Sequence, residues 1–206
     1  MNKKWIIQSA PSHAEVEKLK NELKVGEIIA KLLLQKGIDS KQKAEEFLLP
    51  KLSDLHDPFL LKDMDQAVGL VNKTIQQNGK ILLFGDYDVD GTTAVSLMYL
   101  SLLSHYSNIS YYIPDRYTEG YGISEKGIDY AIENDYSLVI SLDCGIKSIE
   151  LIQYARENGL EFIVCDHHQP GEELPNCVVL DPKRKDCNYP FKELSGCGVG
   201  FKLLQA

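Results

Sequence analysis

Residues 81–94 have the sequence ILLFGDYDVDGTTA, in which a short apolar run passes through Gly85 into three aspartates and then into small residues. A continuous apolar run of this length predicts a strand that is buried on both faces, as in a parallel sheet. The glycine and the aspartates predict that the chain leaves the sheet there and enters a helix that runs from Thr92 to about residue 105.

The same alternation continues to the end of the chain. Further apolar runs of strand length occur at 109–113, 138–142, 162–165 and 178–180, with helical patterns at 125–134 and 147–158. Strands that alternate with helices predict right-handed crossovers. The predicted fold class is therefore α/β, with a five-stranded, mainly parallel sheet and helices on both faces.

The residues before this sheet predict a helical segment. Ser12 with Glu15 forms a capping-box pattern, and Asp39 with Gln42 forms a similar one. The helical patterns lie at 14–23, 25–34, 44–49 and 67–77, and the stretch from Pro50 to Leu61 is an expected connector. We expect two parts, a helical extension over residues 1–79 that packs on the core and an α/β domain over residues 80–206.

Composition limits the class of protein. The 206 residues are 44% hydrophobic and 25% charged, with a formal net charge of −8, which disfavours a broad basic face for nucleic acid. The five cysteines include no CxxC pair, and no apolar run has the length of a membrane span or a signal peptide. We expect a cytoplasmic protein without a disulfide framework and without a membrane partner.

An acid lies at or just after the end of every predicted strand. These acids are Asp86, Asp115, Asp143, Asp166 and Asp181. In open parallel sheets, ligands bind outside the carboxyl ends of the strands. Several carboxylates at one edge would repel each other unless cations lay between them, so this edge is the predicted site.

The first group of site residues is Asp86, Asp88 and Asp90. Alternate residues of an extended segment point the same way, so these three carboxylates are expected to converge on a metal. Thr92, at the start of the following helix, is a candidate to receive a phosphate oxygen. The alternative is an acidic turn that caps the helix; an EF-hand is disfavoured because Leu97 stands where its glutamate belongs.

Asp166, His167 and His168 form the second group, at the end of another predicted strand. Carboxylates with imidazoles and without thiolates suit Mn²⁺ or Mg²⁺. Asp143 ends a middle strand and is the candidate to bridge two ions about 3.5–4 Å apart, which would activate a water for phosphoryl displacement.

Two further features suit phosphate handling. Arg116 could bind a phosphate bidentately, with Tyr117 or Tyr121 stacking on a base; the alternative is an ion pair of Arg116 with Asp115 or Glu119. Gly196 and Gly198 could form an anion nest at a helix N-terminus, or they could belong to a plain helix-entry loop.

Five segments, in this order, resemble the motifs of the DHH phosphoesterases, and the tyrosine in the first is similar to the RecJ branch of that family. They are ILLFGDYDVDGTTA (81–94), IPDRYTEGYG (113–122), LDCG (142–145), VCDHH (164–168) and SGCGVGFKL (195–203).

The resemblance implies a Mn²⁺- or Mg²⁺-dependent exonuclease that degrades single-stranded DNA from the 5′ end to mononucleotides in recombination and repair. It implies Asp88, Asp90, Asp143 and His167 as metal ligands, with Asp86, Asp166 and His168 as ligands or their supports. Helicases or single-strand-binding proteins would be partners. It also places one more ligand beyond Ala206, so we expect a fragment with little nuclease activity of its own.

Two alternatives to this function stay open. One is another DHH phosphoesterase, acting on oligoribonucleotides, cyclic dinucleotides or pyrophosphate. Such relatives begin the first motif with a histidine, where this chain has Phe84, Gly85 and Asp86. The other is a non-catalytic scaffold similar to RecJ, which is expected to lack site acids that this chain retains.

Overall fold

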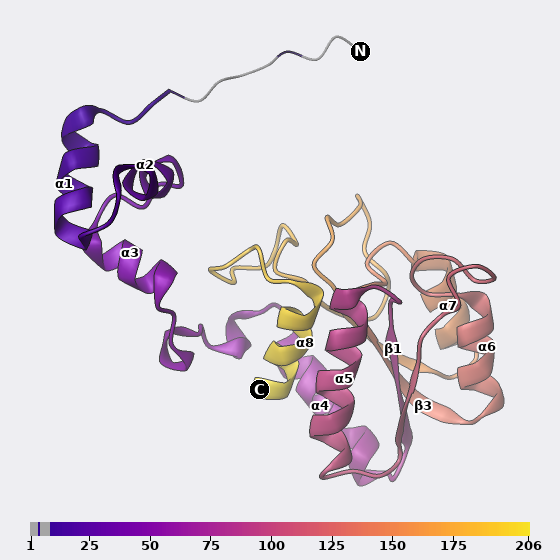
Figure 1. Cartoon of the computed structure of the whole chain (residues 1–206). Coiled ribbons are helices and arrows are strands. Elements are labelled where there is room, and N and C mark those ends of the chain that lie inside the picture. The colour runs from indigo at the N-terminus through magenta and orange to yellow at the C-terminus, as the bar shows by residue number, and fades with distance from the viewer. Residues whose placement is uncertain (1–3, 5–8) are drawn as a thin grey trace. The chain divides into compact units, whose positions relative to one another are not determined.

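The structure is a computed structural model that describes Lys4 and residues 9–206 (Figure 1). The chain divides into two compact units, Met1–Leu55 and His56–Ala206. In the first unit lie helices α1 (His13–Leu23), α2 (Glu27–Gln35) and α3 (Lys41–Leu48), followed by a 3-10 turn at Leu52–Asp54.

The first unit has its own small core, formed by Val16, Leu19, Ala30, Leu33, Ile38 and Ala44. The capping box at Ser12 is confirmed, because the Glu15 amide donates to Ser12 Oγ and the Ser12 amide donates to Glu15 Oε2. The expected cap at Asp39 is wrong. Ser40 caps α3 by accepting from the Lys43 amide, while Asp39 forms an ion pair with the Lys43 ammonium group.

The second unit is built on a five-stranded sheet in the order β2-β1-β3-β4-β5, with every neighbouring pair parallel. This confirms the predicted fold class. The strands are β1 (Lys80–Gly85), β2 (Ile109–Tyr112), β3 (Tyr136–Leu142), β4 (Glu161–Cys165) and β5 (Val178–Leu180). The helices are α4 (Met64–Gln76), α5 (Val89–Leu103), α6 (Glu125–Glu133), α7 (Ile149–Glu157) and α8 (Gly196–Gln205), with a 3-10 turn at Pro58–Leu60.

Helices cover both faces of the sheet. Alternate strand residues belong to different cores, so that Ile81 and Leu83 pack on one side while Leu82 and Phe84 pack on the other. Helices α4, α5 and α8 cover the first side, and α6 and α7 cover the second (Figure 1). Each strand therefore contributes apolar side chains to two layers, which explains the continuous apolar runs in the sequence.

Two boundaries differ from expectation. Helix α5 begins at Val89 and not at Thr92, because Asp88 caps it by accepting hydrogen bonds from the Asp90 and Gly91 amides. The division into compact units falls after Leu55 in the sequence rather than after residue 79, and the expected domain boundary between residues 79 and 80 stays a prediction. Helix α4 belongs to the second unit because Met64 and Ala67 are part of the core on the sheet. That the helical extension packs on this core stays a prediction.

No helix among residues 9–206 is long and apolar enough to cross a membrane.

The order of the strands determines where a ligand can approach. The chain passes from β1 to the edge strand β2 and then returns to β3 on the other side of β1. In sheets of this kind, the carboxyl ends of the two strands at such a reversal border the binding crevice. Here those strands end at Gly85 and Leu142, so Asp86 and Asp143 stand at the crevice.

Candidate metal centre

Four aspartates form a row along the carboxyl edge of the sheet. The strand register aligns Gly85 with Leu142, Leu142 with Cys165, and Cys165 with Leu180. The residues that follow are Asp86, Asp143, Asp166 and Asp181, and each is at most 2% exposed. Adjacent strands are about 4.8 Å apart, so the register alone brings four buried carboxyl groups close together. How each one is hydrogen-bonded distinguishes their roles.

Both carboxylate oxygens of Asp166 accept hydrogen bonds. Its Oδ1 accepts from the His167 amide at 2.7 Å, the His168 amide at 3.1 Å and His168 Nδ1 at 2.7 Å. Its Oδ2 accepts from the Ile146 amide at 2.9 Å. With its lone pairs used in this way, the carboxylate is placed to orient His168 and the turn after β3.

Asp143 has the opposite environment. Its Oδ1 is buried and accepts no hydrogen bond, although His167 Nε2 lies 3.1 Å away. Burial, followed by the nearby charges of Asp90 and Asp88, raises the pKa of Asp143 to about 7. A buried carboxylate without donors is costly unless a cation approaches it.

The backbone at Asp143 is also unusual. It adopts a left-handed conformation with φ of 64°, which is uncommon for residues other than glycine, asparagine and aspartate. The start of α8 lies against it, because a Cβ atom added to Gly196 would lie 2.3 Å from Asp143 Oδ1. Gly196 is therefore required by its close approach to this carboxylate.

Asp86 and Asp181 are intermediate cases, with one oxygen bonded and one not. Asp86 Oδ1 accepts from the Gly122 amide at 3.2 Å, and Asp181 Oδ1 accepts from the Lys183 amide at 2.7 Å. The Oδ2 atoms of both are buried without a partner. Burial raises the pKa of Asp181 to about 6.

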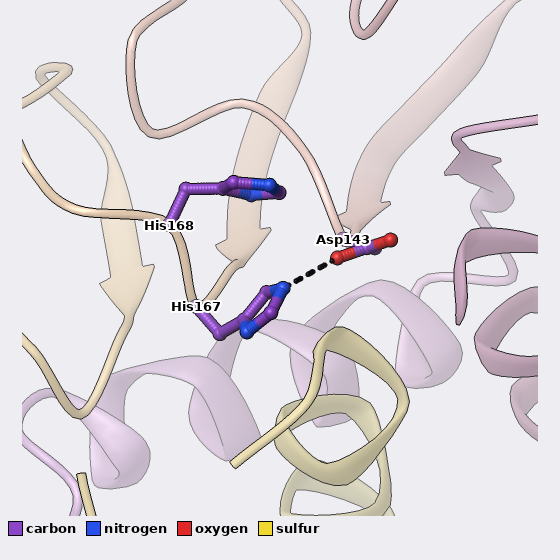
Figure 2. A group of neighbouring side chains, drawn as sticks. All are labelled: Asp143, His167 and His168. Carbon is purple, nitrogen blue, oxygen red and sulfur yellow. Dashed lines mark ion pairs between the residues drawn. The ribbon is translucent and has the colours of Figure 1, made fainter. Parts of the chain in front are cut away.

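The two histidines follow β4 and face Asp143 (Figure 2). One ligand atom from each of Asp143, His167 and His168 can be chosen so that all three lie within 4.8 Å of one another. His168 Nδ1 lies 2.7 Å from Asp166 Oδ1, and a neutral ring that donates there from Nδ1 has an acceptor at Nε2. The Tyr121 hydroxyl lies 3.1 Å from that Nε2 atom. His167 directs Nε2 toward Asp143, and within residues 9–206 its ring forms no hydrogen bond like those of His168.

Asp88 and Asp90 do not extend the row of buried acids, because α5 has already begun. Asp88 is the exposed cap of that helix. Asp90 lies in its first turn, where its two oxygens accept from the Gly196 and Cys197 amides at 2.7 and 2.8 Å. Asp90 Oδ2 is 3.8 Å from His167 Nε2, so this carboxylate borders the same space. The expectation that the three aspartates lie in one extended segment is wrong for this reason, and their convergence on a metal stays a prediction.

The donors expected to bind phosphate at two helix N-termini have partners within the chain. The Gly196 amide is bonded to Asp90, and the Gly198 amide donates to Ser195 Oγ. The Thr92 hydroxyl donates to the Asp88 carbonyl at 2.7 Å. In this structure, the start of α8 holds a carboxylate of the chain where the glycine-rich pattern predicted a substrate phosphate.

The loop between β2 and α6 carries Arg116. Its two acids are bonded elsewhere: Asp115 accepts from the Tyr117 and Thr118 amides, and Glu119 accepts from Ser124 and Tyr112 and pairs with Lys126. Among the described residues Arg116 forms no ion pair, so the alternative pairing with Asp115 or Glu119 is absent from this structure. Tyr117 is 94% exposed, and Tyr121 lies against His168.

Sequence reasoning missed Tyr87, which lies between Asp86 and Asp88 and stands beneath the guanidinium group of Arg116. It also missed the backbone amides of Gly122 and Ile146, which hold Asp86 and Asp166. The first segment quoted above contains Tyr87, but its contact comes from a loop far along the chain. No local pattern could have identified it.

The cysteines beside the acids are not activated. Cys144 and Cys165 are buried, and burial, followed by the charge of Asp166, raises the pKa of both thiols. A thiol in such surroundings is a small packing residue and a poor nucleophile.

A parallel sheet with acids and paired histidines at its carboxyl edge is the arrangement of a known class of proteins. The model of the DHH family, N-terminal domain, matches residues 80–206, so the chain belongs to the DHH family.

Two relatives illustrate its place in that family. The chain is 41% identical over 204 residues to the single-stranded-DNA-specific exonuclease RecJ of Bacillus subtilis (strain 168), covering 98% of the chain and 26% of that protein. The crystal structure of RecJ in complex with Mn²⁺ from Thermus thermophilus matches with a TM-score of 0.73 and 29% identity, covering 96% of the chain and 27% of that structure. These matches confirm the resemblance to the RecJ branch. The chain spans about a quarter of the length of these relatives.

Proposed function

We propose that this chain carries the metal site of a DHH-family phosphodiesterase that removes mononucleotides from single-stranded DNA in the 5′ to 3′ direction. The proposal includes a cytoplasmic location and a role in recombination and repair. The relatives named above support it, because their names state a single-stranded-DNA-specific exonuclease and a complex with Mn²⁺.

The observation that carries the proposal is the pair of donor-free oxygens at the strand reversal. Asp86 Oδ2 and Asp143 Oδ1 are buried without a hydrogen-bond partner, while their neighbour Asp166 has a full set. Unpaired buried carboxylate oxygens are rare in folded proteins and suit a bound cation. Nitrogen atoms of His167 and His168 lie close to the Asp143 carboxylate.

The donor set suits Mn²⁺ or Mg²⁺, because it consists of carboxylate oxygens and imidazole without thiolate. The residues that would hold the ions are Asp88, Asp90, Asp143 and His167, with Asp86 beside them and Asp143 shared between two ions. When bound, such ions lower the pKa of a water molecule and stabilise charge on the phosphoryl oxygens.

The remaining residues of the site would hold these groups in place. Asp166 fixes the orientation of His168, and the first amides of α8 fix Asp90. Arg116 would hold a phosphate oxygen of the substrate through its guanidinium group, for which its free donors are suited. Tyr117, the more exposed tyrosine of that loop, is a candidate to stack on a base.

Metal binding is tested most directly by titration calorimetry with Mn²⁺. Asp143→Ala is expected to abolish binding or weaken it by at least about 100-fold, because a bridging carboxylate serves both ions. The matched control is Asp115→Ala, which removes an exposed strand-end acid that is bonded only within its own turn. Unchanged affinity in Asp143→Ala would remove Asp143 from the site.

The substrate class is tested on the full-length protein, since the chain alone is expected to have little nuclease activity. The substrates are 5′-labelled single-stranded DNA, a short RNA and pyrophosphate, each with Mn²⁺ and with chelator. Preferential release of mononucleotides from DNA supports the proposal. Faster hydrolysis of RNA or pyrophosphate would assign the chain to another DHH activity, and Mn²⁺ binding without hydrolysis of any of them would favour a scaffold.

A further inference from the structure

We propose that Tyr87 is a positioning residue that holds the guanidinium group of Arg116 beside the metal site by a cation–π contact. The ζ-carbon of Arg116 lies 5.3 Å from the centre of the Tyr87 ring. This inference rests on the proposed role of Arg116 as the phosphate ligand and deepens it, because it explains how an exposed arginine is directed toward the row of acids.

Arg116 has no ionic anchor in its own loop. Asp115 and Glu119 flank it but are bonded to amides, hydroxyl groups and Lys126, and Arg116 forms no ion pair within residues 9–206. Its guanidinium donors are therefore available to a substrate, since an aromatic face attracts the charge without accepting N–H bonds in the usual way. An arginine bound by carboxylates would have to break those bonds before it could bind a phosphate.

The Tyr87 ring is itself held in place. Tyr121 packs edge-on against it, with ring centres 6.2 Å apart and an angle of 88° between the planes. The Tyr121 hydroxyl lies 3.1 Å from His168 Nε2, and His168 is bonded to buried Asp166. A continuous series of contacts thus leads from the buried carboxylate at the end of β4 to the guanidinium group.

The position of Tyr87 in the chain adds a second constraint. It lies between Asp86 and Asp88, so the ring that supports Arg116 belongs to the same short segment as two of the site acids. A phosphate bound by Arg116 is consequently held near the carboxylates rather than elsewhere on the loop. Leucine or serine at this position would keep the acids but would leave Arg116 unsupported.

The test measures the affinity for thymidine 5′-monophosphate by NMR titration at saturating Mg²⁺, with thymidine as the probe that lacks a phosphate. Arg116→Ala is expected to weaken binding of the nucleotide by about 10–100-fold, the range for a charged hydrogen-bonding group. Tyr87→Leu is expected to weaken it by roughly five-fold, and Tyr87→Phe is expected to restore it because the ring is retained. Tyr87→Leu combined with Arg116→Ala should equal Arg116→Ala alone.

Two controls separate positioning from folding. Tyr111→Leu removes an exposed tyrosine outside this cluster that also packs edge-on against an aromatic neighbour, Tyr99, and it should have no effect on nucleotide affinity. Progressively fluorinated phenylalanines at position 87 keep the shape of the ring but weaken the attraction of its face for a cation, so the affinity should fall in steps with fluorination.

Each outcome bears on the proposal. A flat fluorination series, or additive losses in the double variant, would overturn the role of Tyr87 while leaving Arg116 as the phosphate ligand. Loss of thymidine affinity in Tyr87→Leu would assign the ring to base stacking instead. A wild-type protein that binds nucleotide and nucleoside equally well would remove Arg116 from the proposed function, and the inference with it.

Discussion

Asp143 and Asp166 occupy equivalent positions on adjacent strands and are buried to the same degree, yet one accepts no hydrogen bond at Oδ1 and the other accepts four in all. Burial alone therefore does not distinguish an acid that is hydrogen-bonded within the fold from an acid that we propose to bind a cation. The supply of donors distinguishes them. Asp166 is predicted to stabilise the folded chain, whereas Asp143 is predicted to destabilise it until a metal ion binds.

The largest expected change in stability follows from substitution of Asp166. Asp166→Ala should lower the free energy of unfolding by about 3–5 kcal/mol, because three backbone amides and one imidazole lose a buried charged acceptor. Urea unfolding in the presence of a chelator measures this, with Asp115→Ala as the exposed control that should cost less than about 1 kcal/mol. A small loss in Asp166→Ala would show that water replaces the carboxylate and that the contrast with Asp143 is weaker than its geometry indicates.

At Asp143, removal of the charge is expected to raise the free energy of unfolding, the opposite of the effect at Asp166. Its folded pKa of about 7 exceeds the ordinary value of 3.8, so the folded state favours the protonated form and loses stability as pH rises from about 4 through 7. In chelator, Asp143→Asn should equal the wild type near pH 4 and be more stable by up to about 4 kcal/mol above pH 7. At saturating Mn²⁺ the wild type should instead be more stable than the Asp143→Asn variant, because only the wild type gains the free energy of metal binding. A variant less stable than the wild type in chelator at pH 8 would contradict this account.

Asp181 offers a finer version of the same comparison, since one of its oxygens is bonded and the other is not. Its pKa is raised to about 6, so the cost of its charge should develop at a lower pH than that of Asp143. Asp181→Asn is expected to be more stable than the wild type by up to about 3 kcal/mol above pH 6, with no difference near pH 4. Unfolding curves at several pH values would separate the pH ranges over which the Asp143 and Asp181 variants become more stable than the wild type. Coincident ranges would show that the two acids titrate as one group.

The smallest effect concerns the approach of α8 to Asp143. Gly196→Ala places a Cβ atom against that carboxylate and should cost about 1–3 kcal/mol of stability, together with weaker Mn²⁺ binding. Gly69→Ala is the matched control, because Gly69 lies in α4 with open space around its Cβ position and should gain about 0.5–1 kcal/mol. Unaltered Mn²⁺ affinity in Gly196→Ala would mean that Asp143 can shift without consequence for the site.

The sequence predicted those features that depend on neighbours along the chain. Apolar runs located all five strands to within about two residues, and Ser12 with Glu15 located the first helix. The acid edge was also predictable, because parallel strands bring their carboxyl ends together whatever their order. These inferences need only local pattern and the geometry of the sheet.

Features that depend on distant partners were not predictable. Asp39 and Ser40 are both good helix caps, and only the backbone conformation of the folded chain selects Ser40. The glycine-rich start of α8 has the pattern of a phosphate-binding turn, but its amides bind Asp90. That residue lies over a hundred positions earlier, so the local pattern could not show the contact. The four donors to Asp166 come from two turns of the chain, so neither their number nor the lack of a donor to Asp143 Oδ1 could be inferred from residue types.

The left-handed backbone at Asp143 has an evolutionary consequence. At φ of 64°, asparagine and glycine are the residues that the backbone accepts most readily, and aspartate is retained there against the cost of its buried charge. Selection for folding alone would therefore move this position toward asparagine, which a single nucleotide change in an aspartate codon produces. A descendant that keeps the fold but lacks this carboxylate, and with it the proposed metal ligand, lies one substitution away.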